Sequence, residues 1–112
     1  GAMGIVPAGQ DRVRGVVQLS PAGELGYWLH PEDQGRGLMT EAAAALLAEH
    51  FAGSEAPVWS GYMPENAASA RVLAKLGFRP AGRLSRPHRA LGHTVEIRRV
   101  TLDAAGWRVR CA

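Results

Sequence analysis

Two glycines stand directly before the longest helical stretch of the sequence. Gly35 and Gly37 lie in a loop after a strand-like segment, and an alanine- and leucine-rich run, 38–52, begins at once. The first turn of a helix offers unpaired backbone N–H groups and the positive end of the helix dipole. Glycines let another group approach the backbone closely. The loop is therefore suited to a phosphate or pyrophosphate, although a glycine turn before a helix is more often just a turn.

Two other phosphate-binding patterns do not fit this sequence. It contains no G-x-x-x-x-G-K-[ST] run, which argues against a P-loop. It also lacks G-x-G-x-x-G with an acidic residue downstream, which argues against a Rossmann dinucleotide site.

The pattern along the chain predicts an α/β (α+β) domain with a mixed, mostly antiparallel sheet flanked by two helices. Asn66 suits a helix N-cap, while Gly53 and Gly77 suit helix ends. Along the first helix, one side at helical spacing consists of Leu38, Ala42, Ala45, Leu46 and Glu49. The predicted order is β-β-α-β-α-β-β, with strands at 13–19, 24–29, 58–63, 81–85 and 94–102 and helices at 38–52 and 67–76.

Length and composition indicate one globular domain. The chain has 112 residues, of which 1–3 resemble an expression scar and 4–112 form the expected domain. No apolar run approaches the roughly 18 residues of a membrane span, and no signal peptide is visible, so we expect a cytoplasmic protein. The single cysteine, Cys111, is expected to be a free thiol on a frayed tail. The histidines show no zinc-ligand spacing, and no metal is expected.

Positive charge is concentrated in the second half of the chain. The net charge is +3, and residues 71–112 hold ten of the thirteen Lys and Arg residues but only two of the ten acids. This pattern suits a solvated basic face, or a surface for nucleic acid or a phosphate-bearing cofactor. Only Phe78 and Trp107 are aromatic in this half, which weakens the case for binding single strands by base stacking.

Four segments together resemble the GNAT superfamily of N-acetyltransferases, most closely its RimJ/RimL branch, which acetylates protein N-termini. They are 26–31 (Gly-Tyr-Trp-Leu-His-Pro), 34–42 (Gln-Gly-Arg-Gly-Leu-Met-Thr-Glu-Ala), 66–69 (Asn-Ala-Ala-Ser) and 73–78 (Leu-Ala-Lys-Leu-Gly-Phe). The second segment is similar to the family's Gln/Arg-x-x-Gly-x-Gly/Ala pyrophosphate motif, with Met39 in the last place. The resemblance covers about residues 13–102.

The resemblance implies acetyl-CoA as the co-substrate, lying between two splayed strands, 24–29 and 58–63. Backbone groups of the first strand would hold the pantetheine and acetyl ends, and amides of the glycine loop would wrap the pyrophosphate. Two basic side chains on the second helix would meet the nucleotide phosphates, or form a solvated helix face. The implied cofactor residues are Trp28, Leu29, His30, Gln34, Gly35, Arg36, Gly37, Leu38, Met39, Thr40, Asn66, Ser69, Arg71 and Lys75.

The resemblance leaves the catalytic groups less defined. Many family members carry a tyrosine acid at the position of Leu73, so the acid here differs. The RimJ/RimL branch points instead to Ser69 near the thiol and to a carboxylate position that aligns with His88, a reasonable base near neutral pH. Glu24 is a second candidate base, or an edge-strand charge that aids solubility.

The family normally begins with a strand and two helices that build one wall of the acceptor site. This chain has about ten residues before its first clear strand, so we expect a shortened or naturally short member with an exposed sheet edge. We expect that edge to be covered in a homodimer or by another segment. The leading hypothesis is acetyl transfer to a primary amine, on a protein N-terminus or a small molecule. The alternatives are a non-catalytic acyl-CoA-binding module and, last, a nucleic-acid-binding domain.

Overall fold

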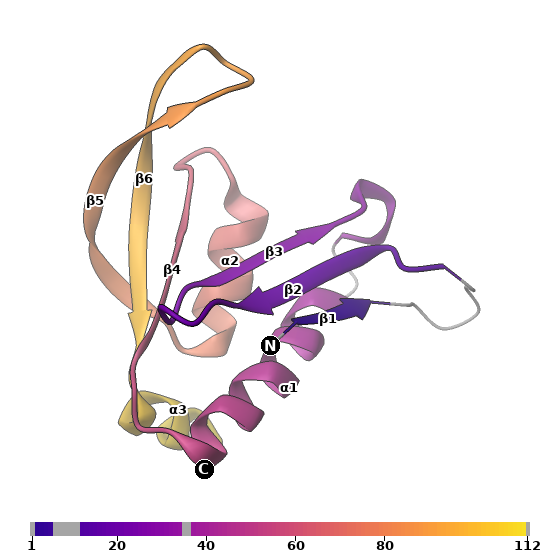
Figure 1. The fold of residues 1–112 in the computed structure, drawn as a ribbon, viewed down its shortest axis with the longest axis vertical. Coiled ribbons are helices and arrows are strands. Elements are labelled where there is room, and N and C mark those ends of the chain that lie inside the picture. The colour runs from indigo at the N-terminus through magenta and orange to yellow at the C-terminus, as the bar shows by residue number, and fades with distance from the viewer. Residues whose placement is uncertain (1, 6–11, 35–36, 112) are drawn as a thin grey trace.

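The computed structural model describes residues 2–5, 12–34 and 37–111. Within them, two antiparallel sheets of three strands lie next to each other (Figure 1). The first has the order β1-β2-β3, with β1 at Ala2–Ile5, β2 at Gly15–Leu19 and β3 at Leu25–Leu29. The second has the order β4-β6-β5, with β4 at Val58–Tyr62, β5 at Arg79–His88 and β6 at His93–Leu102. The predicted α/β fold and its mostly antiparallel pairing are confirmed.

Three α-helices pack around these sheets. They are α1 (Leu38–Gly53), α2 (Ala67–Leu76) and α3 (Ala104–Cys111), and a short 3-10 helix, η1 (Pro31–Asp33), follows β3. Figure 1 shows α1 running along the first sheet and α3 lying near the far end of α1. No helix in the described part of the chain is long and apolar enough to cross a membrane.

The core forms where the helices meet both sheets. On α1 the buried residues are Met39, Ala43, Leu46, Leu47 and Phe51. Of the predicted side, Leu46 is buried and Leu38 and Ala42 are partly buried against the core, whereas Ala45 and Glu49 are exposed. Alanine and leucine occur all around α1, and the sequence therefore gives little contrast between its faces. On α2, Ser69, Leu73 and Leu76 are buried and Val72 is partly so, at the spacing of one helix side.

The third helix corrects the prediction of two. Asp103 accepts a hydrogen bond from the Gly106 amide at 2.6 Å and begins α3. Trp107 then stacks on Phe51 with 6.0 Å between ring centroids. The segment ending at Cys111 is therefore a packed helix instead of a frayed tail. Its two short turns contain Gly106, and the resulting low helix propensity hid it from the sequence pattern.

The first strand was also missed. Ala2 and Met3, set aside as an expression scar, pair with Gln18 and Val17 of β2, and Ile5 pairs with Gly15. A four-residue edge strand carries too little periodicity to be recognised from sequence.

Gly77 ends α2 in a left-handed conformation, with φ at 97°. Its amide donates to the Ala74 carbonyl at 3.0 Å, and the Phe78 amide donates to the Leu73 carbonyl at 3.1 Å. This pair of bonds is a Schellman motif, which satisfies carbonyls at the end of the helix. An ideal Cβ at Gly77 would meet its nearest atom, Leu102 Cδ1, at an ordinary 3.5 Å, so glycine is needed for its backbone conformation and not for space.

Gly77→Ala should therefore lower the free energy of unfolding by about 1 to 2 kcal/mol, the cost of a left-handed non-glycine residue. The matched control is Gly53→Ala at the end of α1, where the space is open and φ is not positive. Urea unfolding of the two variants measures the difference. An equal effect of both substitutions would contradict the conformational explanation.

Candidate active site

Strands β3 and β4 touch at one end and then diverge. Glu24 and Trp59 form a parallel bridge, in which the Trp59 amide donates to the Gly23 carbonyl at 2.9 Å. Ser60 Oγ, buried, then donates to the Leu25 carbonyl at 2.8 Å. Figure 1 shows the two strands separating beyond this junction. The separation opens a V between the sheets, as the resemblance implied.

A cavity of about 420 Å³ lies at this V. Three parts of the chain line it: β3, the start of α1 with the residue Gln34 before it, and α2. The lining residues are Tyr27, Trp28, Leu29, Gln34, Gly37, Leu38, Met39, Thr40, Asn66, Ala68, Ser69, Arg71, Val72 and Lys75. The structure thus brings most of the proposed cofactor residues to one cavity. Gly35 and Arg36, which belong to the same prediction, lie outside the described residues.

The start of α1 makes one end of this cavity receptive to an anion. Gly37 is the N-cap, with φ at 75°, and it supplies no side-chain cap to the helix. The amides of the first turn therefore remain available at the positive end of a 16-residue helix. Arg71 and Lys75 add positive charge from α2 on the same cavity lining. A diphosphate group suits this combination.

Tyr27, Asn66 and Ser69 form the inner end of the cavity. Asn66 Oδ1 caps α2 by accepting from the Ser69 amide at 3.1 Å. The Tyr27 hydroxyl forms a short hydrogen bond with Ser69 Oγ and lies 3.4 Å from the Ser69 carbonyl. Burial raises the pKa of Tyr27, against a smaller lowering by the Ser69 hydrogen bond. The phenol is therefore protonated at neutral pH and can donate.

Tyr27 is a site residue that the sequence interpretation missed. It entered only as part of the 26–31 segment of the resemblance, with no role in the site, although Leu25 and Leu29, at alternate positions of β3, are buried. Because side chains alternate along a strand, this pattern places Tyr27 on their inward side and leaves Trp28 58% exposed. The alternate positions of Leu25, Tyr27 and Leu29 in the sequence were therefore the signal from which Tyr27 could have been found.

A second cavity, of about 280 Å³, also reaches Tyr27, Asn66 and Ser69. Its remaining lining comes from the start of β3 and from β4, β5 and β6: Glu24, Leu25, Gly26, Trp59, Ser60, Gly61, Tyr62, Leu84, Arg86, Ile97 and Arg99. The two cavities therefore have the Tyr27–Ser69 pair as a common part of their walls. Glu24, one of the candidate bases, lines only the second cavity.

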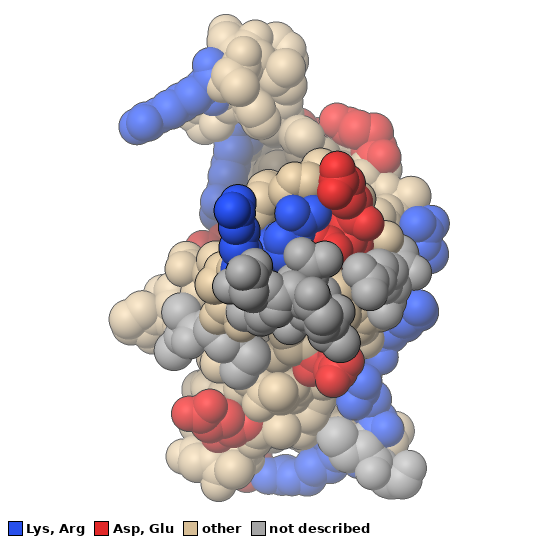
Figure 2. Space-filling model, turned by 90° about the vertical axis from the view of Figure 1, so that its right-hand side faces the viewer, with Lys and Arg blue, Asp and Glu red and all other residues tan. Residues whose placement is uncertain are grey.

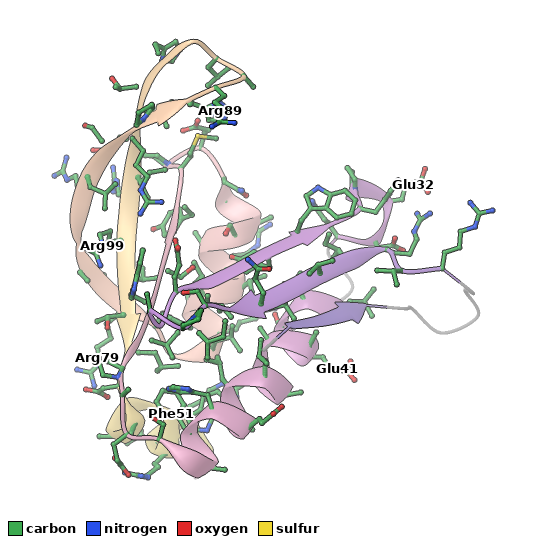
Figure 3. The ribbon with its side chains drawn as sticks, viewed as in Figure 1. Glu32, Glu41, Phe51, Arg79, Arg89 and Arg99 are labelled. Atoms are coloured by element: carbon green, nitrogen blue, oxygen red, sulfur yellow. The ribbon has the colours of Figure 1, made fainter. Side chains whose placement is uncertain are left out.

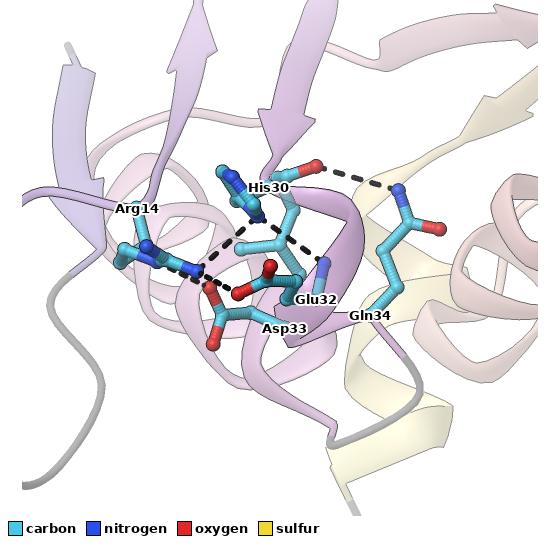
Figure 4. Close-up of polar contacts among 6 residues, drawn as sticks. Arg14, His30, Glu32, Asp33 and Gln34 are labelled. Atoms are coloured by element: carbon cyan, nitrogen blue, oxygen red, sulfur yellow. Dashed lines mark hydrogen bonds and ion pairs between the residues drawn. The ribbon is translucent and has the colours of Figure 1, made fainter.

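His30 and His88 lie elsewhere. His30 Nδ1 lies 3.2 Å from Arg14 Nη2 and accepts from the Glu32 amide at 3.2 Å (Figure 4). Arg14 Nε also pairs with the buried Asp33 carboxylate at 2.7 Å, and this bond holds the pKa of Arg14 above its usual value. This cluster ties η1 to Arg14, which directly precedes β2, so the structure places His30 in this cluster and not in the cavity lining.

His88 ends β5, where its Nδ1 accepts from the Leu91 amide at 3.2 Å. It lines neither cavity, and the structure does not bring it together with Ser69. A sequence alignment through the 88–93 turn could not foresee this, because β5 and β6 extend as a hairpin past the sheet (Figure 1).

Charge on the surface is mixed. Figure 2 shows Lys and Arg side chains interspersed with Asp and Glu over the face that it presents, without one continuous basic patch. Across residues 2–5, 12–34 and 37–111, no group of three or more His, Cys, Asp or Glu side chains is placed to hold a metal ion.

Comparison with known proteins gives a consistent result. A family model for the GNAT acetyltransferase domain matches residues 1–79. A probable N-acetyltransferase of Bacillus subtilis, YjcK, is 34% identical over 87 residues, which are 70% of this chain and 48% of that protein. The chain thus spans about half the length of this relative.

Two solved structures share the fold. The ribosomal-protein-S5-alanine acetyltransferase of Vibrio fischeri has a TM-score of 0.74 and 26% identity, over 86% of this chain and 57% of that one. RimJ of Mycobacterium smegmatis, in complex with CoA-disulfide, has a TM-score of 0.69 and 25% identity, over 89% of this chain and 55% of that one.

Deprotonation of Tyr27 should lower the free energy of unfolding at alkaline pH. Its pKa is raised by folding, so its contribution is fully present below the ordinary phenol value of about 10 and is lost as pH rises through the higher folded value. Between pH 9 and 11 the wild type should lose more unfolding free energy than Tyr27→Phe. Chemical unfolding of both at each pH measures this difference, and parallel curves would contradict the buried phenol.

Proposed function

The chain belongs to the GNAT acetyltransferase family, and from this premise we propose that it transfers the acetyl group of acetyl-CoA to a primary amine. The observation that carries the proposal is the 420 Å³ cavity, which joins an uncapped helix start to the Tyr27–Ser69 pair. The acceptor class in view is a protein N-terminus or a small amine.

The first turn of α1, with Arg71 and Lys75, is proposed to bind the pyrophosphate and nucleotide phosphates. Gly37 leaves this approach open, since an ideal Cβ there meets nothing within 4 Å. The inner edge of β3 is proposed to hold the pantetheine beside α2, because both elements line the same cavity. This pose supports placing the thioester near Ser69, which lines both cavities.

In the proposed reaction the acceptor nitrogen forms a bond to the thioester carbonyl carbon, and the carbon–sulfur bond breaks. The amine loses one proton and the departing thiolate takes one up. Ser69 Oγ, backed by the protonated Tyr27, is proposed to donate to the sulfur. Glu24 is proposed to receive the amine proton, because it lines the cavity on the opposite side of Ser69. The resemblance had pointed to His88 as the base. Because His88 lies in the hairpin and lines neither cavity, Glu24 is the better candidate.

CoA binding tests the cofactor half of this proposal. Gly37→Trp should weaken CoA binding about tenfold or more, since the indole would cover the helix start and displace charge-assisted hydrogen bonds. Gly92→Trp is the matched control, because Gly92 has a similar φ of 71°, open space around it and a place in the distant hairpin. Calorimetric titration with CoA compares the three proteins. Equal affinities for Gly37→Trp and the wild type would place CoA elsewhere.

Turnover tests the catalytic half. A thiol-release assay with acetyl-CoA and a panel of peptides and small amines should detect transfer by the wild type. Glu24→Gln should lower kcat about a hundredfold, as expected for a lost general base. If only His88→Ala caused such a loss, His88 would be the general base instead of Glu24. Clear CoA binding without turnover of any acceptor would contradict the proposed enzyme activity and would favour a non-catalytic acyl-CoA-binding module.

A further inference from the structure

The second cavity contains a cation that its surroundings do not neutralise. Three charged side chains line it: Glu24, Arg86 and Arg99. Arg86 Nη1 lies 3.8 Å from Glu24 Oε2, so these two charges offset each other. No carboxylate in the described part of the chain lies within ion-pair distance of Arg99. The cavity therefore carries one surplus positive charge.

Arg99 lies against an aromatic ring, in a cation–π contact. It lies on β6 (Figure 3), and its guanidinium carbon is 4.7 Å from the centre of the Trp59 ring. Its Nε is buried and has no hydrogen-bond partner among the described residues. Most buried donors in proteins are satisfied, and an unpaired one is costly, so Arg99, which lines the cavity, has a hydrogen-bonding capacity that the described residues leave unused.

The cavity wall beside Arg99 is closely packed. Gly61 of β4 pairs with Arg99 in the sheet register. A Cβ on Gly61 would come within 2.7 Å of Ile97 Cγ2, so the packing here accepts only glycine. Ile97 fills the space beside Gly61, and both residues line the second cavity together with Arg99.

We infer that the second cavity binds the acceptor and that Arg99 recognises an anionic group on it, so that the substrate is a small primary amine carrying a carboxylate or phosphate. This inference rests on the proposed acetyl transfer. The cavity meets the proposed thioester position at Ser69, which lets an amine bound there reach it. Glu24 is the proposed base for the amine, and Arg99 faces the anion. Their positions therefore set the orientation in which the acceptor binds. A guanidinium matches the paired oxygens of both anion types.

The test compares amines that differ only in the anion. The pairs are 4-aminobutanoate with butylamine, for the carboxylate, and phosphoethanolamine with ethanolamine, for the phosphate. The wild type should favour the anionic member of at least one pair about tenfold or more in kcat/KM, the usual value of a hydrogen bond to a charged group. Arg99→Gln should abolish the preference by raising KM for the anionic amine alone. Arg99→Lys should restore part of it.

The matched control is Arg98→Gln. Arg98 is the next residue on β6, lies outside the cavity lining and pairs with Glu96 at 3.3 Å. It should keep the preference of the wild type. A merely structural role for Arg99 would lower kcat/KM for both members of a pair equally, so the ratio separates recognition from stability.

Calorimetric binding of the same amines to the CoA complex separates this inference from the proposed function. Binding of an anionic amine that depends on Arg99, without turnover, would uphold the site and refute acetyl transfer. Equal use of anionic and neutral amines by the wild type, an unchanged preference in Arg99→Gln, or no amine binding at all would overturn the inference. Acceptance of an acidic peptide N-terminus alone would overturn the small-molecule assignment.

Discussion

The hydrogen bond from Ser60 Oγ to the Leu25 carbonyl joins β3 to β4 just before the two strands part. Beyond it, no hydrogen bond links these strands in the described residues, and each strand belongs to its own sheet. Both atoms are buried, so losing the bond would cost about 1 to 3 kcal/mol for an unsatisfied group. The parting of the strands creates the space that α2 borders, and the two cavities exist because of it.

The two cavities differ in how they are charged. The larger one combines backbone amides at a helix start with Arg71 and Lys75, an arrangement that attracts several phosphates without a carboxylate partner in its lining. The smaller one combines Glu24, Arg86 and Arg99, and it suits a molecule with charges of both signs. Between them, Tyr27 and Ser69 supply hydroxyl groups and no charge at neutral pH. In the proposed reaction, the larger cavity is the cofactor side and the smaller cavity is the acceptor side.

Local signals in the sequence predicted much of this structure. Asn66 and Gly77 bound α2 as predicted, since a side-chain cap and a left-handed glycine are properties of single residues. The start of α1 after Gly37 followed from the same reasoning. By contrast, the buried side of α1 and the existence of α3 depend on packing against distant elements, Trp107 on Phe51 in particular. An alanine-rich helix and an eight-residue helix with a glycine carry too little pattern to reveal such contacts.

The same distinction explains the outcome for the candidate catalytic residues. Ser69 was a candidate through the resemblance, and its position is fixed locally by the Asn66 cap. The location of His88 depends instead on the path of a hairpin that no motif encodes. Arg99 escaped notice because only the structure reveals its unpaired Nε and its contact with Trp59. Charge alone could not separate it from the other arginines of the basic half.

The most direct test of the central claim is a crystal structure of the chain with CoA bound. The account predicts the pyrophosphate within hydrogen-bond distance of the Leu38–Thr40 amides, the pantetheine between β3 and α2, and the sulfur near Ser69. A CoA molecule bound outside the V between β3 and β4, or with its pyrophosphate away from the start of α1, would contradict it.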